Sequence, residues 1–480
     1  MPEPQHPGRL KRELGLFHAV LLGLGSILGT GVFVSIGIAA GIAGPGVLIA
    51  IVLAALLALC NGLSSAQLAA AHPVAGGTYE YGYQFLHPKL GFTAGWMFLL
   101  AKSASAATAA LAVGFLVLEQ ILVQTSFNDL LFQSGISHDT AKLILSVLFV
   151  IVTTLFVLIG LRKSAWFNAM LVLITVVGLL MIGVYIAFGL TVVPDDWWTQ
   201  VKFRFERYTS EDLMAATAFI FVAFTGYGRI ATLGEEVRKP KTTIPLAIIL
   251  ALGLVTVLYF SVGLVLISAT SPFEWHYNEG DLLMRVVELN NGPRGLSGLV
   301  TLAAIAAMLG TLLNLILGLS RVVLAMGRRR DMPTLFTRID ASHSTPVPAV
   351  IGVGVLIAGL VMIGDIKTAW TFSAFTVLIY YGITNLAALR LPKENRLYPR
   401  VFSYAGLAGC LFLCWWVQPI IWLIGLGLIG LGLLWHVMAP KMFGVPALPT
   451  EACIQCGYDL RASVGQCPEC GHAIPDEAAT

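Results

Sequence analysis

The chain has 480 residues, of which 57% are apolar and only 11% are charged, and its mean hydropathy is +0.83. Because soluble domains carry about 25% charged residues, this composition excludes a soluble globular fold. The net charge is only +3, so no nucleic-acid partner is predicted.

Apolar residues occur in blocks of roughly 20, the length that crosses a hydrocarbon core of about 30 Å. We therefore predict an all-α polytopic membrane protein in the lipid bilayer. The twelve predicted spans lie near residues 15–38, 45–71, 92–119, 141–160, 165–190, 212–236, 243–268, 296–327, 347–364, 369–390, 401–418 and 420–438. The first apolar block is too long for the core of a cleaved signal and has no small-residue cleavage site. We expect it to remain in the mature protein.

Lys and Arg predict the orientation, because they are enriched in cytoplasmic connections. Placing the N-terminus inside puts seventeen of them on the cytoplasmic side before the C-terminal tail is counted, and about seven outside. Both termini are therefore predicted to lie in the cytoplasm, and the membrane to be the cytoplasmic (inner) membrane. Residues 191–211 should form an outer loop anchored by Trp197 and Trp198. A short amphipathic helix is predicted at 281–290.

Three parts follow from the composition: an N-terminal tail (1–14), a membrane domain (15–440) and a cytoplasmic tail (441–480).

Glycines interrupt two of the predicted spans. The first reads GLGSILGTGVF from Gly23 to Phe33, and the sixth reads FVAFTGYG from Phe221 to Gly228. Backbone that leaves helical geometry at membrane depth is tolerated only where it lies within protein or lines a cavity. Interruptions at matching places in two halves of a membrane chain indicate a transporter's substrate site. The alternative is that the glycines only let helices pack closely.

The two interruptions suit opposite charges. At the first, Gly29 and Gly31 flank Thr30, and the half-helix that follows presents N–H groups and a positive dipole end suited to a carboxylate. Hydroxyl groups of Ser26 and Thr30 add donors. At the second, we expect the carbonyls of Phe221, Val222, Ala223 and Thr225 to be released where the helix unwinds, and carbonyl oxygens suit an ammonium group. Together they predict a zwitterionic ligand.

Four segments make the chain resemble the amino acid/polyamine/organocation permeases, and in particular bacterial relatives of the cationic amino acid transporters. They are GSILGTGVF in the first span, HPVAGGTYEYGY from His72 to Tyr83, FVAFTGYGRIATLGEEVRKP from Phe221 to Pro240, and the pair Ile244–Pro245. The resemblance covers about residues 14–440. It implies the leucine-transporter type of fold, a five-plus-five inverted repeat in which helices 1 and 6 are broken and helices 11 and 12 lie outside the repeat.

The resemblance also implies which residues contact an α-amino acid, and it makes Phe221 or Phe224 a candidate for an aromatic lid. An aromatic ring that merely faces lipid or the core is the alternative for each. The predicted substrate-binding residues are Ser26, Ile27, Gly29, Thr30, Gly31, Phe221, Val222, Ala223, Phe224, Thr225 and Gly226.

The predicted coupling residues depart from the family pattern. Proton-coupled relatives carry a lysine on the fifth helix, where sodium-coupled relatives hold sodium, but FNAMLVLITVV places Thr175 there. Lys102 instead lies inside the third span, where an unpaired cation costs at least about 3 kcal/mol and should face a cavity or a partner. A desolvated lysine can release its proton near neutral pH, as proton coupling requires. Two alternatives remain: a purely structural Lys102, and a sodium ion bound by the Thr175 hydroxyl.

Charged residues after the second interruption bear on selectivity. Arg229 takes a place where some cationic-amino-acid relatives have an acid, so Arg229 and Lys102 together disfavour a cationic substrate. We therefore expect a neutral amino acid. Arg229 is expected to pair with Glu235 or Glu236, and these two carboxylates to form a cytoplasmic gate.

The tail contains Cys453-x2-Cys456 and Cys467-x2-Cys470, with Gly457 and Gly471 after each pair. Two such turns supply four thiolates for tetrahedral zinc, and the run 453–472 resembles a small zinc ribbon. A reducing cytoplasm disfavours disulfides there. The ribbon could sense, dock an unknown protein partner, or merely cap the chain.

The predicted function is secondary active transport of an amino acid by alternating access, with a proton as the coupling ion. The sequence has no GxxxxGK[ST] loop for nucleotide binding and no nucleophile–base–orienter set, so an enzyme is not predicted. The alternatives are a transporter-like sensor that signals through the zinc tail, and sodium-coupled or exchange transport of cationic amino acids or polyamines.

Overall fold

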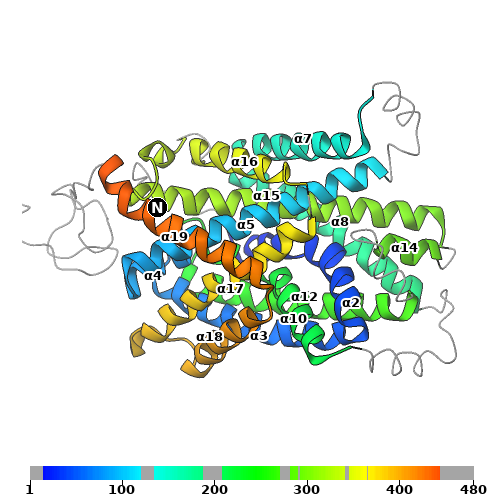
Figure 1. The fold of residues 1–480 in the computed structure, drawn as a ribbon, viewed down its shortest axis with the longest axis horizontal. Helices are drawn as coiled ribbons and strands as arrows, with labels where there is room; N and C mark the ends of the chain where they lie inside the picture. Colours follow the sequence, from blue (N-terminus) through cyan, green and yellow to red (C-terminus); the bar gives the residue numbers. More distant parts are fainter. Residues whose placement is uncertain are drawn as a thin grey trace, which may run out of the picture.

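The computed structural model describes residues 14–119, 135–187, 208–270, 282–289, 292–340, 345–364 and 366–443. Within these ranges the chain is helical, and its only β-pairing is two isolated bridges, Leu14 with Val237 and Asp340 with Thr345. The long helices run side by side along the longest axis of the molecule (Figure 1). The predicted all-helical class is therefore confirmed.

The helical elements follow one another with short connections. In chain order they are α1 (Leu16–Ile27), η1 (Gly31–Ser35), α2 (Ile36–Ala43), η2 (Gly44–Gly46), α3 (Val47–Ala71), α4 (Thr78–Phe85), α5 (Pro88–Val117), α7 (His138–Leu158), α8 (Leu161–Ala187), α10 (Ser210–Phe224), η4 (Thr225–Tyr227), α11 (Gly228–Ala231), α12 (Pro240–Ala269), α14 (Leu282–Leu289), α15 (Arg294–Arg328), η5 (Thr334–Thr337), α16 (Val347–Val361), α17 (Ile366–Arg390), η6 (Lys393–Asn395), α18 (Arg400–Trp415) and α19 (Pro419–Phe443).

Nine helical segments in the described ranges are long and apolar enough to cross a membrane. The first of them, Leu16–Ala71, covers two predicted spans, and the shorter apolar helices α16 and α18 coincide with the ninth and eleventh. Every predicted span thus coincides with a helix, while twelve crossings remain a prediction. The predicted amphipathic helix at 281–290 is confirmed as α14.

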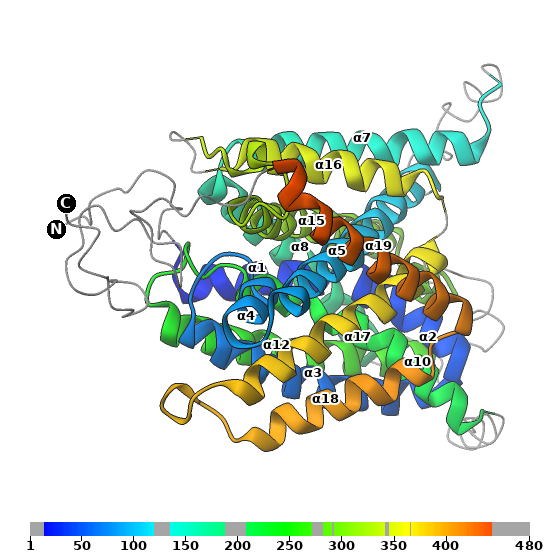
Figure 2. The same cartoon turned by 60° about the vertical axis from the view of Figure 1, so that its left-hand side comes forward.

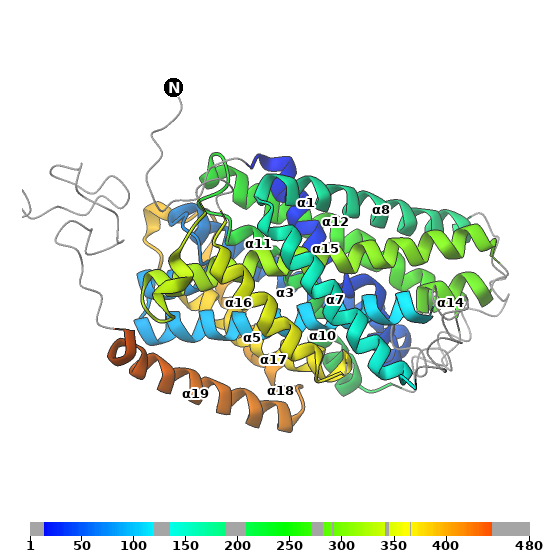
Figure 3. The same cartoon turned by 90° about the horizontal axis from the view of Figure 1, so that it is seen from above.

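Central and peripheral helices differ in burial. In the most apolar stretch of 18 residues, α5 is 83% buried, whereas α19 is only 17% buried. Figure 2 shows α7 beside α16, and Figure 3 shows α19 along the edge of the bundle next to α5. Lipid can therefore cover α19, while α5 lies among other helices and positions the residues of the site.

Both glycine-rich helices are interrupted, but neither is widely unwound. The first passes from α1 through a turn at Leu28 and Gly29 into the π-helix η1, and the second passes from α10 through the 3₁₀ turn η4 into α11. Leu28 and Thr30 keep right-handed helical dihedral angles, and Thr225, with φ −73° and ψ 2°, lies just outside that region. The expected unwinding was therefore overestimated, since a change of hydrogen-bond register already interrupts an α-helix.

Candidate substrate site

The two interruptions lie against each other in the middle of the bundle. A Cβ added at Gly226 would meet the backbone carbonyl of Ser26, so only glycine allows this approach. The Tyr259 hydroxyl on α12 donates a hydrogen bond to the Ile27 carbonyl at 2.6 Å and lies 3.2 Å from the Ala223 carbonyl. Segments about 200 residues apart in the sequence therefore form one site.

Side-chain hydroxyls satisfy carbonyls at the second interruption. Thr225 Oγ1 donates to the Val222 carbonyl at 2.6 Å, and the Tyr381 hydroxyl on α17 donates to the Thr225 carbonyl at 3.1 Å. Buried carbonyls need donors, because an unpaired polar group in an apolar interior is costly. Three of the four carbonyls expected here, those of Val222, Ala223 and Thr225, thus lie within hydrogen-bond distance of side-chain hydroxyls.

Lys102 reaches the second interruption from α5. Its Nζ donates a hydrogen bond to Thr225 Oγ1 at 2.6 Å, and the residue is only 3% exposed. No carboxylate among the described residues pairs with it. Lys102 is therefore a buried amine whose hydrogen-bond partner is a neutral hydroxyl.

The glycines of the first interruption also allow close packing. A Cβ at Gly25 would meet Asn168 and Asn314, one at Gly29 would meet Thr311, and one at Gly31 would meet the Tyr259 hydroxyl. The packing interpretation of these glycines is therefore correct as well, and it is compatible with a binding role. Ser26 Oγ donates to the carbonyl of Leu22. The Thr30 hydroxyl makes no hydrogen bond within the part of the chain that the structure describes.

Both candidate lid residues are fully buried. The Phe221 ring packs edge-on against Tyr381 with centroids 5.9 Å apart, and the Phe224 ring lies 5.0 Å from that of Tyr259. Each therefore contacts a tyrosine that donates to a carbonyl of the site. Neither ring faces lipid.

Thr175 lies on α8, away from Lys102. Its hydroxyl donates to the Leu171 carbonyl at 2.8 Å and lies 3.4 Å from the Ala303 carbonyl on α15. The hydroxyl is thus engaged with backbone oxygens at the junction of α8 and α15.

An amide cluster near this junction was not predicted. Asn168 Nδ2 donates to the Leu21 carbonyl at 2.9 Å, Asn314 Nδ2 donates to Asn168 Oδ1, and Thr311 Oγ1 donates to the Gly25 carbonyl at 3.1 Å. These contacts join α1, α8 and α15. The sequence contained one signal for this cluster: Asn168 lies within the apolar run around Thr175, and a polar amide inside a span needs a hydrogen-bond partner.

Arg229 does not form its expected ion pair. It is 2% exposed, and its Nη1 donates to Thr232 Oγ1 at 3.0 Å, while its Nε and Nη2 have no hydrogen-bond partner among the described residues. The expected partners are engaged elsewhere: Glu236 accepts from Arg321, and Glu235 accepts from Arg328. The prediction was wrong because it considered only partners near in sequence, whereas α15 supplies both arginines.

Ion pairs join the predicted gate residues to α15. Arg321 donates to Glu236 Oε1 through Nε at 2.9 Å and Nη2 at 2.6 Å, and both side chains are buried. Arg328 and Glu235 pair at 2.7 Å. On the same face the start of α1 is attached, because the Leu14 N–H donates to the Glu236 carbonyl and the Arg238 N–H donates to the Leu14 carbonyl. The two carboxylates thus tie this end of the bundle to α15, and their role as a gate stays a prediction.

A second group of contacts lies beside this gate. Glu80 on α4 accepts from Arg329, whose Nη2 is 2.6 Å away, and the hydroxyls of Tyr79 and Tyr83 donate to Asp331. Burial, together with nearby Asp331, raises the pKa of Tyr79 well above its ordinary value, so this hydroxyl stays protonated and donates. None of these residues was predicted, although the quoted segment HPVAGGTYEYGY contains three of them.

Metal-binding clusters are absent from the part of the chain that the structure describes. The four cysteines predicted to bind zinc, and Trp197 and Trp198, lie outside the described residues.

Comparison with known proteins places this geometry in context. Residues 18–443 match the family "Amino acid permease". An uncharacterized transporter of Mycobacterium tuberculosis is 37% identical over 85% of this chain and 86% of its own length. The branched-chain amino acid permease BcaP of Bacillus subtilis is 30% identical over 88% and 92%, and the methylthioribose transporter of the same organism is 27% identical over 80% and 82%. Cationic amino acid transporters of animals and plants also match.

Proposed function

The chain belongs to the amino acid permease family, whose members are transporters rather than enzymes, and on that basis we propose that it moves a neutral α-amino acid across the cytoplasmic membrane by alternating access, coupled to protons through Lys102. The single observation that carries the proposal is the bond from Lys102 to Thr225, at the point where the two interrupted helices meet. This hydrogen bond places the titratable amine of Lys102 beside the carbonyls of Val222 and Thr225.

The substrate's carboxylate is assigned to the first interruption and its ammonium to the second. The Thr30 hydroxyl and the N–H groups that follow it suit the carboxylate. The ammonium would exchange with the hydroxyls of Tyr259 and Tyr381 as donor to the carbonyls of Ala223 and Thr225. This exchange keeps the buried carbonyls paired whether or not substrate is bound.

Protonation and substrate affinity are linked at Thr225. Lys102 contacts Thr225 Oγ1, which in turn donates to the Val222 carbonyl at the proposed ammonium site. A protonated Lys102 repels an ammonium group at this site, so loss of its proton favours substrate binding, and bound substrate lowers the proton affinity of Lys102 by the same coupling free energy. Sodium at Thr175 is the competing account, because the hydroxyl that donates to the Leu171 carbonyl keeps its lone pairs.

Neutral substrates are favoured by the buried cations. Lys102 and Arg229 both lie near the pathway without a carboxylate partner among the described residues. A cationic side chain would add a further positive charge, and like charges repel strongly where the dielectric constant is low. The relative named for branched-chain amino acids is consistent with a neutral ligand.

The test is uptake by proteoliposomes across the amino acids, with polyamines and methylthioribose in the same screen. We expect accumulation of neutral amino acids. A preference for arginine, lysine, a polyamine or methylthioribose would contradict the substrate assignment. Binding without accumulation would favour the sensor, the alternative that the cysteine-rich tail supports.

For the tail we propose one structural zinc on Cys453, Cys456, Cys467 and Cys470, facing the cytoplasm with both termini inside. Such small modules gain their folding energy from the metal. Elemental analysis of the purified chain should find about one zinc per molecule, held by the four thiolates. The Cys453→Ser/Cys467→Ser variant should lose it. Wild-type chain without zinc would contradict the proposal.

A further inference from the structure

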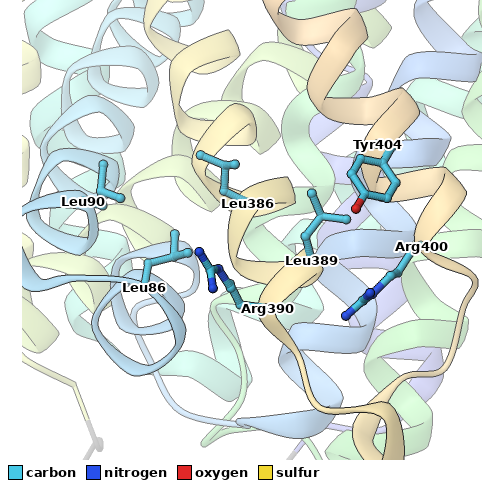
Figure 4. A pocket seen from close by; sticks show the side chains of 7 residues that line it. All are labelled: Leu86, Leu90, Leu386, Leu389, Arg390, Arg400 and Tyr404. Carbon is cyan, nitrogen blue, oxygen red and sulfur yellow. The ribbon is translucent and has the colours of Figure 1, made fainter.

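A pocket of about 520 Å³ opens on the surface of the bundle, and none of its lining residues belongs to the interrupted helices. Its lining residues are Leu86, Leu90, Leu386, Leu389, Arg390, Arg400 and Tyr404. Leu86 directly follows α4, Leu90 lies in the first turn of α5, and the other residues come from α17 and α18 (Figure 4). This volume lies within the range of about 300–1,000 Å³ that small-molecule sites occupy.

The pocket has an apolar part and a cationic part. In Figure 4 the two arginines lie toward the connection between α17 and α18, whereas Leu90 and Leu386 lie at the other end. Helical spacing explains this division, because Leu386 is one turn before Arg390 on α17 and Tyr404 is one turn after Arg400 on α18. One ligand could therefore contact both parts.

Both arginines are available to a ligand. Arg390 and Arg400 are exposed, and neither guanidinium has a hydrogen-bond or ion-pair partner among the described residues. The pocket is lined by no acidic residue. The neighbouring connection carries Lys393, Arg396 and a single acid, Glu394. The positive charge of the pocket and of this connection is therefore complementary to an anion.

The pocket also lies at the ends of two apolar helices, where the headgroups of a surrounding bilayer would be. Arg390 is the last residue of an apolar membrane-crossing helix and Arg400 is the first residue of the next apolar helix. Leu90, Leu386 and Tyr404 are 38%, 36% and 57% exposed on the outside of the bundle, where acyl chains would cover them. Tyrosine is enriched at this boundary because it has an apolar ring and a polar tip.

From these observations we propose that this pocket binds an anionic phospholipid, with its phosphate between Arg390 and Arg400 and an acyl chain along Leu386 and Leu90. Arginine binds phosphate oxygens in a bidentate manner, and basic pockets between membrane helices on the cytoplasmic side recognise acidic headgroups. This site is independent of the transport proposal, because it uses none of the residues of the substrate site.

Native mass spectrometry of the purified full-length chain in detergent tests the proposal, with phosphatidylglycerol as the probe and phosphatidylcholine for comparison. Phosphatidylglycerol should bind more tightly. The Arg390→Ala/Arg400→Ala variant should bind phosphatidylglycerol with roughly 30-fold lower affinity, equivalent to about 1 kcal/mol for each basic residue. The matched control, Lys241→Ala/Arg338→Ala, removes two exposed cations elsewhere and should leave the affinity within about twofold, because charges beyond a Debye length are screened.

Two further measurements distinguish a specific lipid site from non-specific electrostatic attraction of the lipid headgroup. Leu386→Trp keeps both arginines but fills the apolar part, and it should weaken phosphatidylglycerol by roughly tenfold, as expected when a ligand loses apolar contact. Glycerol phosphate, the headgroup without acyl chains, should bind far more weakly than the lipid. The proposal is overturned if the two lipids bind equally, if the control variant loses as much affinity as the arginine variant, if Leu386→Trp has no effect, or if glycerol phosphate binds as tightly as the lipid.

Discussion

Charged side chains are paired differently in the centre of the bundle, around Lys102, and at the predicted gate, around Glu235 and Glu236. At the gate, Arg321, Arg328 and Arg329 each contact a carboxylate, those of Glu236, Glu235 and Glu80. At the centre, Lys102 has a single neutral partner, Thr225, and Arg229 keeps two donors that no described residue accepts. The pairs with α15 bring opposite charges into contact, whereas Lys102 has only a neutral partner and Arg229 lies within electrostatic reach of the Glu236–Arg321 pair without contacting a carboxylate.

This difference in pairing suits two different roles, closing one face of the bundle and binding a ligand at its centre. Ion pairs between α15 and the end of the sixth predicted span join two parts of one face, and in the gate that we predict they break when this face opens. Hydroxyl bonds at the centre can exchange one donor for another at low cost, since the net contribution of a typical hydrogen bond is only about 0.5–1.5 kcal/mol. A ligand can therefore replace them without disrupting the fold.

The largest effect should follow from breaking the buried gate pair with Glu236→Gln. This change leaves Arg321 unpaired inside the protein, which costs about 3–5 kcal/mol. Thermal unfolding of the purified chain should show a large loss of stability. The double variant Glu236→Gln/Arg321→Met removes both charges and should recover much of it. A single variant as stable as wild type would mean that the gate does not depend on this pair.

A smaller effect should follow at the contact between the two interruptions. In Gly226→Ala the new methyl group meets the Ser26 backbone, and overpacking of this kind costs about 1–3 kcal/mol. We expect strongly reduced uptake and a moderate loss of stability. Gly253→Ala on α12 is the matched control, because its Cβ meets nothing within 4 Å. Equal uptake by the two variants would show that the close approach is unimportant.

Tyr259→Phe should have the smallest of these effects. It removes the hydroxyl that joins Ile27 to Ala223 and costs about 1 kcal/mol, because the buried Ile27 carbonyl loses its donor. The KM for substrate should change by several-fold while the chain remains folded. Tyr404→Phe, at an exposed position, serves as the control. If both variants have the KM of the wild type, Tyr259 does not organise the site.

The sequence predicted the helices and the two interruptions well, because apolar periodicity and glycine placement are local signals. Phe221–Gly228 and Gly23–Phe33 were found without any knowledge of packing, and the structure brings them together. The degree of unwinding was overestimated because glycine content does not show whether a helix unwinds or only shifts its hydrogen-bond register.

Long-range partners could not be predicted. Arg321 of α15 pairs with Glu236 across 85 positions, and Tyr259 and Tyr381 reach the carbonyls from two other helices. Tyr259 and Tyr381 are ordinary members of apolar spans until the helices are packed, whereas Arg321, a cation inside the predicted span 296–327, was a signal that was missed. Lys102 was singled out because an isolated cation in a span is costly, but its contact with Thr225 required the structure.

The most direct test of the account is Lys102→Met in proteoliposomes with an imposed pH gradient. Wild-type uptake should depend on the gradient and be indifferent to sodium, whereas Lys102→Met should keep substrate binding and lose the dependence on the gradient. Lys441→Met, at an exposed position on α19, should behave as wild type. Uptake that requires sodium, or a Lys102→Met chain that keeps its full response to pH, would show that Lys102 is only structural.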